Sequence, residues 1–140
     1  MSNQAVLLPL IVQVALTFAI GFWMASKRVA AVRSRAVHPR DIALREPNWP
    51  KHLLQLQNAY LNQFELPVLF YVLTILVVFT KTGDLLFVVP AWIFVALRLA
   101  HAYVHVTSNR VPRRGLLFLA GAVVLCVMWI IFAIRILSGT

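Results

Sequence analysis

Residues 53–80 read LLQLQNAYLNQFELPVLFYVLTILVVFT, a run that is apolar over most of its length yet carries several amides and one carboxylate in its first half. A helix needs about 20 residues to cross roughly 30 Å of hydrocarbon, and this run is long enough. It is too long for a strand and lacks the alternation of polar and apolar residues found in membrane barrels. Because backbone groups in lipid must be hydrogen bonded internally, the segment is predicted to be a transmembrane helix.

Three further apolar segments of similar length lie at residues 6–25, 85–106 and 115–137. The chain has 140 residues, 61% of them hydrophobic and only 12% charged, which departs far from the average soluble composition. We therefore predict an all-α integral membrane protein that forms a four-helix bundle. The polar stretch 26–52 is too short to bury a core of its own, so residues 1–140 are expected to be a single domain. No basic residue precedes the first segment, which we interpret as a membrane anchor rather than a signal peptide.

The basic residues are distributed unevenly among the connections of this bundle. The first loop holds Lys27, Arg28, Arg33, Arg35, Arg40, Arg45 and Lys51, and the third holds Arg110, Arg113 and Arg114. Loops rich in Lys and Arg usually remain in the cytoplasm. We therefore predict that loops one and three are cytoplasmic and that both termini lie on the opposite side, with Arg135 as the dissenting charge.

The net charge of +9 does not by itself indicate a nucleic-acid partner. The positive-inside rule already accounts for the basic excess, and no nucleic-acid recognition motif is present, so membrane lipids are the expected partners. A channel is disfavoured, since the first and last segments have almost no polar residues between their ends. Cys126 lies between apolar neighbours and is expected to be a buried, inert thiol.

A polar face runs along the first half of the 53–80 segment. Gln55, Asn58, Asn62 and Glu65 are spaced three or four residues apart and therefore share one side of a helix. Pro67 lacks an amide hydrogen and is predicted to kink the helix just beyond this face.

The 85–106 segment carries a second polar stripe, formed by Arg98, His101 and His105. Glu65 is the intramembrane acid and Arg98 the deepest intramembrane base, so we predict that they form an ion pair, because an isolated charge at that depth is costly. Such a pair can serve a ligand site, or it can simply fix helix register or a subunit contact. Both interpretations stay open.

His101 and His105 are one helical turn apart, a spacing that can bind a metal ion. Neither a cysteine nor a second acidic residue completes a tetrahedral set, so no metal is expected and hydrogen bonding to a polar ligand is the better role. Arg110, Arg113 and Arg114 begin the last segment, where cations oppose the helix dipole. An anion there, either lipid phosphate or a bound small molecule, would explain their position.

These residues together resemble the MAPEG family, the membrane-associated proteins in eicosanoid and glutathione metabolism. The resemblance rests on Asn62-Gln-Phe-Glu65, on Arg98-Leu-Ala-His101 and on the stretch Arg110-Val-Pro112-Arg113-Arg114. It implies a left-handed four-helix bundle that assembles as a homotrimer, with glutathione bound between neighbouring subunits near the cytoplasmic side.

The resemblance also implies roles for individual residues. Arg114 matches the arginine beside the thiol in catalytic members, and Arg98 matches the arginine that pairs with the glutamate. The residues expected to contact glutathione are Asn62, Glu65, His101, His105, Arg110 and Arg28. Glutathione carries two carboxylates and an amine, which suits a mixture of arginine, acid and amide side chains. Its thiol must ionise to attack, and a nearby cation favours the thiolate.

The chain departs from the family pattern at several expected ligand positions. Leu61 and Asn58 stand where basic residues are common, His105 replaces a tyrosine, Gly115 replaces a serine, and Phe118 replaces an aromatic residue with a hydroxyl. Two functions therefore stay open. The first is a transferase or peroxidase that uses glutathione or a related thiol on lipophilic electrophiles. The second is a non-catalytic membrane protein that binds a lipid or a partner in the same cleft.

Overall fold

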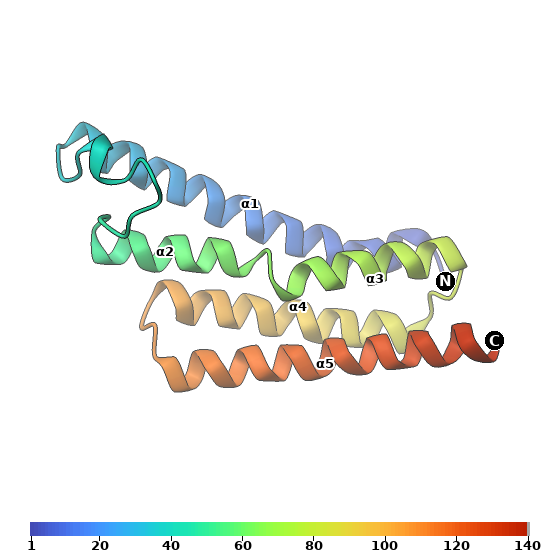
Figure 1. The fold of residues 1–140 in the computed structure, drawn as a ribbon. Coiled ribbons are helices and arrows are strands. Elements are labelled where there is room, and N and C mark those ends of the chain that lie inside the picture. Colours follow the sequence, from blue (N-terminus) through green and yellow to red (C-terminus); the bar gives the residue numbers. More distant parts are fainter. Residues whose placement is uncertain (140) are drawn as a thin grey trace.

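The computed structural model describes residues 1–139, which contain α-helices, one short 3-10 helix and no strand. Within these residues four segments are long and apolar enough to cross a membrane, which confirms the predicted all-α architecture. They are α1 (Asn3–Arg33), α2 (Lys51–Asn62) continued by α3 (Leu66–Thr80), α4 (Leu85–Val106) and α5 (Val111–Ser138). The segments lie side by side, and both termini are at the same end (Figure 1). The chain is an integral multi-pass membrane protein.

The first helix is longer than the sequence predicted. It begins behind Ser2, whose hydroxyl accepts a hydrogen bond from Ala5 N at 3.2 Å, and it continues past the apolar run to Arg33. A helix of 31 residues is about 45 Å long, so its basic end extends beyond the hydrocarbon. The connection that follows contains η1 (Pro39–Asp41) and gathers near the start of α2 (Figure 1).

The second membrane segment is two helices rather than one kinked helix. The break covers Gln63 to Glu65, and Glu65 has non-helical backbone angles of −95° and −105°. Pro67 sits in the first turn of α3, where its missing amide hydrogen costs nothing. The predicted kink at Pro67 is therefore corrected to a complete break just before it.

Apolar side chains form two core clusters, one on each side of a polar layer. Near the termini, Val6, Phe70, Leu73, Phe94 and Leu125 are at most 2% exposed, and near the basic loop Leu53, Leu56 and Ala59 are equally buried. Between these clusters along their helices lie Gln13, Gln63 and Arg98, each no more than 1% exposed. Gln13 Nε2 donates to Gln63 Oε1 at 2.9 Å, which ties α1 to the break after α2.

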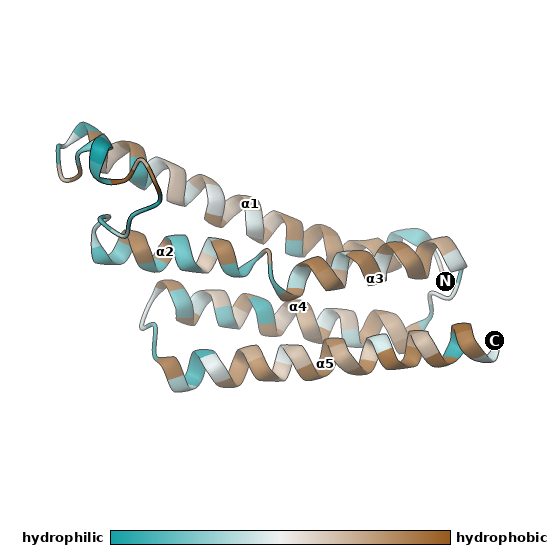
Figure 2. Cartoon of the chain, in the orientation of Figure 1, coloured by the Kyte–Doolittle hydropathy of each residue, from teal (hydrophilic) through white to brown (hydrophobic). Residues whose placement is uncertain are grey.

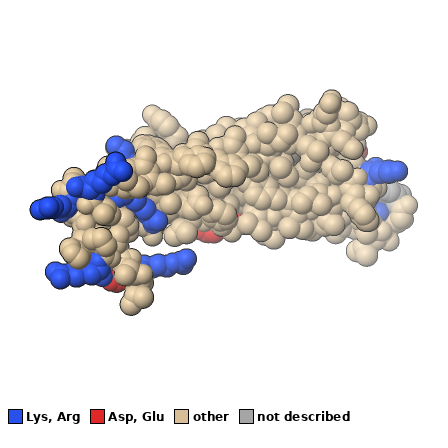
Figure 3. Space-filling view, turned by 90° about the horizontal axis from the view of Figure 1, so that it is seen from above, with Lys and Arg blue, Asp and Glu red and all other residues tan. Residues whose placement is uncertain are grey.

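The outer surface of the bundle carries many large apolar side chains, as a lipid-facing protein requires. Hydrophilic residues gather at the end that holds the first loop (Figure 2). Most Lys and Arg side chains in view cluster at that same end, with few at the other (Figure 3). Cys126 is exposed on α5, so the prediction of a buried thiol is wrong.

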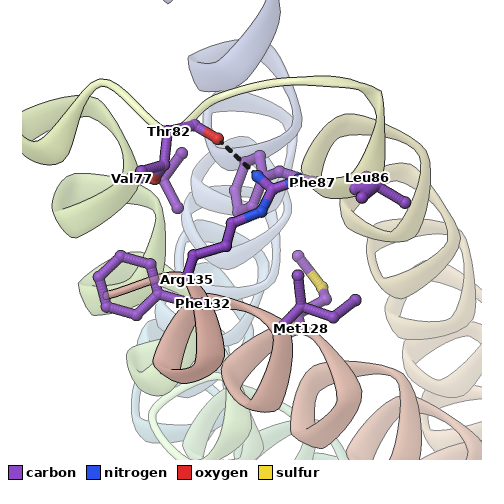
Figure 4. Close-up of a pocket in the computed structure, with 8 residues that line it drawn as sticks. Val77, Thr82, Leu86, Phe87, Met128, Phe132 and Arg135 are labelled. Atoms are coloured by element: carbon purple, nitrogen blue, oxygen red, sulfur yellow. Dashed lines mark hydrogen bonds between the residues drawn. The ribbon is translucent and has the colours of Figure 1, made fainter. Parts of the chain in front are cut away.

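The opposite end of the bundle is closed by Arg135 of α5. Its guanidinium donates to Thr82 O at 3.0 Å and to Asp84 Oδ2 at 2.6 Å, in the turn between α3 and α4. Figure 4 shows this side chain crossing between Phe132 and Phe87 toward Thr82. The hydrogen bond from Arg135 lowers the pKa of the Asp84 carboxyl below its ordinary value. Arg135, the charge that departs from the predicted distribution, is thus paired with an acid at this end of the bundle.

Candidate active site

One cleft of about 470 Å³ brings together most of the polar residues that the sequence singled out. It lies between α2 with the break after it, the second half of α4 and the start of α5. Its volume falls within the range of small-molecule sites, about 300–1,000 Å³. The lining residues are Asn58, Leu61, Asn62, Glu65, His101, His105, Arg114, Gly115 and Phe118.

Asn62 is the link between the buried arginine and the exposed glutamate. Arg98 Nη2 donates to Asn62 Oδ1 and, at 3.4 Å, to the Asn62 carbonyl oxygen, while Asn62 Nδ2 donates to Glu65 Oε1 at 3.1 Å. The ion pairs found within residues 1–139 are Arg40–Asp41 and Arg135–Asp84. The predicted direct contact between Arg98 and Glu65 is therefore wrong, because the break turns Glu65 away from the α2 face and Asn62 takes its place.

Arg98 is the most deeply buried cation of the site, at 1% exposure. Its Nε and Nη1 atoms have no hydrogen-bond partner among the described residues, so Asn62 supplies all of its hydrogen-bond acceptors. A buried charge with so few partners is costly unless its one contact is strong. Asn62 is therefore held tightly against α4 at the wall of the cleft.

The two histidines form the α4 wall of the cleft. His101 is 2% exposed and His105 is 5% exposed, and their ring centroids lie 5.5 Å apart in an edge-to-face arrangement. His101 also faces the Phe118 ring of α5, at a centroid distance of 5.9 Å. Neither nitrogen of His105, nor Nδ1 of His101, has a hydrogen-bond partner within residues 1–139. These three nitrogens are occluded as well as unpaired, so a polar ligand would hydrogen bond to them only after the rings turn toward the cleft.

Arg114 stands in the first turn of α5 and supplies a cation to the cleft. Its Nη1 donates to Asn109 Oδ1 at 2.8 Å. The next residue, Gly115, has no heavy atom within 4 Å of the position where a Cβ would lie. A side chain at position 115 would therefore have room in the cleft.

Two predicted glutathione contacts do not line this cleft. Arg28 lies at a separate cleft of about 240 Å³, beside Arg45 and Tyr60, where its guanidinium stacks on the Trp49 ring at 5.1 Å. Arg110 caps α5 at its start and is exposed. The resemblance places glutathione between subunits, so the contacts expected of Arg28 and Arg110 stay predictions that a single chain does not test. Leu61 lines both clefts and separates them.

Sequence reasoning missed three residues that organise the site. Gln13 and Gln63 form a buried hydrogen bond between α1 and the helix break, and Asn109 accepts a hydrogen bond from Arg114. Gln13 could have been singled out from the sequence, because an isolated glutamine inside an apolar helix usually has a polar partner. Asn109 had no such signal, because its role depends on the shape of a loop. No group of three or more His, Cys, Asp or Glu side chains in the described part of the chain is placed to hold a metal ion.

The match to known families agrees with this arrangement. No curated protein matches the chain. No solved structure matches it either. Residues 6–134 match the MAPEG family, a stretch that includes every residue of the cleft and nearly all of the four membrane segments. The chain therefore belongs to the MAPEG family.

Proposed function

We propose that this protein binds glutathione, or a closely related thiol, in the cleft of Asn62, Glu65, His101 and Arg114, and transfers it to lipophilic electrophiles or uses it to reduce them. The observation that carries the proposal is the convergence of a carboxylate, an amide, two imidazoles and an arginine in one cleft of about 470 Å³. The family is associated with glutathione use.

The donors and acceptors of the cleft complement the groups of glutathione. The Glu65 carboxylate is exposed and can accept from an ammonium group. The imidazole nitrogens of His101 and His105 and the guanidinium of Arg114 can contact carboxylate or amide oxygens. Arg98 stays behind the wall and fixes Asn62 rather than reaching the ligand.

Arg114 is the proposed catalytic residue. Its charge would favour the thiolate over the thiol, as a neighbouring cation does for cysteine. The thiol proton leaves to water, and the thiolate then attacks an electrophilic carbon and displaces its leaving group, or attacks a peroxide oxygen and breaks the O–O bond. In the second case another thiol reduces the resulting sulfenic acid, which gives a disulfide and water. The guanidinium serves as an electrostatic stabiliser of the thiolate. Because the bundle faces lipid, an apolar substrate could approach Phe118 and Leu61 from the bilayer.

Arg28 would contribute to the site from a neighbouring subunit. Asn58 and Glu65 are exposed on a membrane-spanning segment, and an adjacent copy would shield them from lipid. Arg28 Nε is occluded without a hydrogen-bond partner in residues 1–139, in a cleft that shares Leu61 with the first. In a homotrimer the Arg28 cleft of one subunit would face the Arg114 cleft of the next and add a second cation. The basic end of the bundle would lie in the cytoplasm, with both termini opposite.

The apolar side of the cleft favours a second candidate function, the binding of a lipid without catalysis. Leu61, Gly115 and Phe118 stand where the family pattern has polar side chains, and all three line the cleft. A ligand with a polar head and an apolar chain would suit these walls.

Two readouts on the reconstituted protein separate these functions. We expect glutathione to give a thiolate absorbance band at neutral pH and a conjugate with a lipophilic aryl halide. Arg114→Ala should weaken both signals, whereas Arg113→Ala, at an exposed neighbouring position, should change neither. Tight retention of a lipid without a thiolate band would instead support the lipid-binding function and contradict the glutathione proposal.

A further inference from the structure

The loop between α4 and α5 contains a residue in an unusual backbone conformation. Asn109 has a φ of 49°, in the left-handed region that asparagine tolerates better than most residues. Its backbone N–H donates to the Val104 carbonyl oxygen at 2.7 Å. This bond joins the loop to the last turn of α4, so the Asn109 side chain leaves the backbone from a fixed point.

That side chain is the acceptor for the proposed catalytic arginine. Asn109 Oδ1 accepts from Arg114 Nη1 at 2.8 Å, a short distance that is typical of hydrogen bonds to a charged donor. Asn109 is half-buried, which limits competition from water. Arg114 forms no ion pair with any acid in residues 1–139. Its partner is therefore neutral, and its positive charge remains available to a ligand.

The surroundings of Arg114 offer little other restraint. A cation in the first turn of a helix is disfavoured by the helix dipole, which would drive the guanidinium outward. Gly115, the next residue along the wall of the cleft, contributes no side chain that could restrain it, and no other part of the chain comes within 4 Å of the position of its missing Cβ. An arginine side chain free to rotate would lose substantial entropy on binding a ligand. The Asn109 contact removes part of that cost before any ligand arrives.

We propose that Asn109 is a positioning residue, which holds the Arg114 guanidinium at the wall of the cleft while leaving its charge uncompensated. The inference rests on the proposed function for the role of that charge, but the contact itself can be tested without glutathione. An aspartate at this position would hold the guanidinium equally well and would neutralise it. Substitutions at Asn109 can therefore separate the effect of positioning the Arg114 guanidinium from the effect of its uncompensated charge.

The test compares Asn109→Gly, Asn109→Asp and the control Ser108→Gly. Glycine adopts positive φ without strain, so Asn109→Gly keeps the turn and removes only the acceptor. Ser108 is exposed, and its side chain has no hydrogen bond in the described residues. The first readout is the rate at which an arylglyoxal modifies Arg114, followed by peptide mass spectrometry. The second is the apparent pKa of bound glutathione, from its thiolate absorbance.

We expect Asn109→Gly to speed modification of Arg114 and to weaken glutathione binding, each by about three- to tenfold, less than a fully buried hydrogen bond to a charged group would give, because the site is half exposed. It should also raise the thiol pKa toward the ordinary value of about 8.5. Asn109→Asp should leave the modification rate as in the wild type yet raise the thiol pKa. Ser108→Gly should match the wild type in both readouts.

Equal modification rates in the wild type and Asn109→Gly would overturn the proposal, as would an Asn109→Asp protein whose Arg114 is not protected. If Asn109→Gly does not fold, Asn109→Asp still tests the proposal, because its Arg114 should be modified at the wild-type rate while the pKa of bound glutathione rises. If Asn109 had only a structural role in the loop, Asn109→Asp would not keep Arg114 protected from modification and at the same time raise the thiol pKa. If the wild type binds no glutathione, the proposed function fails, while the modification rates still test the Asn109 contact.

Discussion

Replacing Asn62 with leucine should destabilise the bundle more than any other single change in the cleft. Leucine has a similar size but neither accepts from Arg98 nor donates to Glu65. Arg98 is 1% exposed, and its Nε and Nη1 already lack partners in the described chain, so loss of the Asn62 side chain leaves one weak contact at 3.4 Å. A hydrogen bond to a charged group contributes about 1.5–3 kcal/mol. The exposed bond to Glu65 adds about 0.5–1 kcal/mol, giving a total loss of about 2–4 kcal/mol.

The aspartate variant isolates the Arg98 contact from the Glu65 contact. Asn62→Asp keeps an acceptor for Arg98 but loses the donor to Glu65 and places two carboxylates close together. We expect it to lose only about 1 kcal/mol of unfolding free energy, since the buried charge remains paired. The predicted order of stability is therefore wild type, then Asn62→Asp, then Asn62→Leu.

The assay is unfolding in mixed micelles by titration with a denaturing detergent, followed by circular dichroism. Asn58→Leu is the matched control, because Asn58 lines the same cleft one turn earlier on α2, is exposed and forms no side-chain hydrogen bond within residues 1–139. This control should stay within about 0.5 kcal/mol of the wild type. An Asn62→Leu protein as stable as Asn62→Asp would refute the claim that Asn62 carries the buried charge.

Three further predictions concern the Gln13–Gln63 hydrogen bond, the Asp84–Arg135 ion pair and the open position at Gly115. Gln13→Leu should lower the unfolding free energy by about 0.5–1.5 kcal/mol, because it removes the bond to Gln63. Adding Gln63→Leu should then cost only what the remaining bond from Gln63 to the Ala59 carbonyl oxygen contributes, so the double substitution should lose less than the sum of the two single ones; additive losses in the same titration would contradict this. The lowered pKa of Asp84 means that its bond to Arg135 stabilises the fold above the ordinary carboxyl pKa of about 4 and is lost as the pH falls below it. Asp84→Asn should therefore lose about 0.5–1 kcal/mol at pH 7 and nothing at low pH, a screened value because the Asp84 side chain is 46% exposed; a loss independent of pH would argue against the bond. Gly115→Ser should leave stability unchanged, since its Cβ meets open space, and should raise glutathione affinity in calorimetry by about two- to fivefold through one added hydrogen bond; a weaker affinity would show that the cleft does not place glutathione there.

The membrane segments were predictable because about 20 apolar residues in a row leave few alternatives to a spanning helix. Segment 85–106 matches α4 at both ends. The ends of α1 were less predictable, since a helix can continue into polar solvent, and α1 does so as far as Arg33. Pro67 located the disturbance after α2, but a proline marks either a kink or a helix start, and only the packed structure shows the latter.

The cleft was predictable in part, for reasons of helical geometry. Periodicity placed Asn62 on one face of α2 and His101 with His105 on one face of α4, and these faces meet. It could not show that the break turns Glu65 outward, so the direct ion pair with Arg98 was wrong. The role of Arg28 came from the family resemblance rather than from periodicity, and it depends on a neighbouring subunit, because within one chain Arg28 lines a separate cleft.

The most direct test of the account is calorimetric titration of glutathione into the detergent-solubilised wild type, Arg114→Ala and Arg113→Ala. The account predicts that the wild type binds, that Arg114→Ala binds at least about tenfold more weakly, and that Arg113→Ala stays within about twofold of the wild type, because of these two arginines only Arg114 lines the cleft. Absence of binding to the wild type, or equal effects of the two substitutions, would contradict the claim that this cleft is a thiol site.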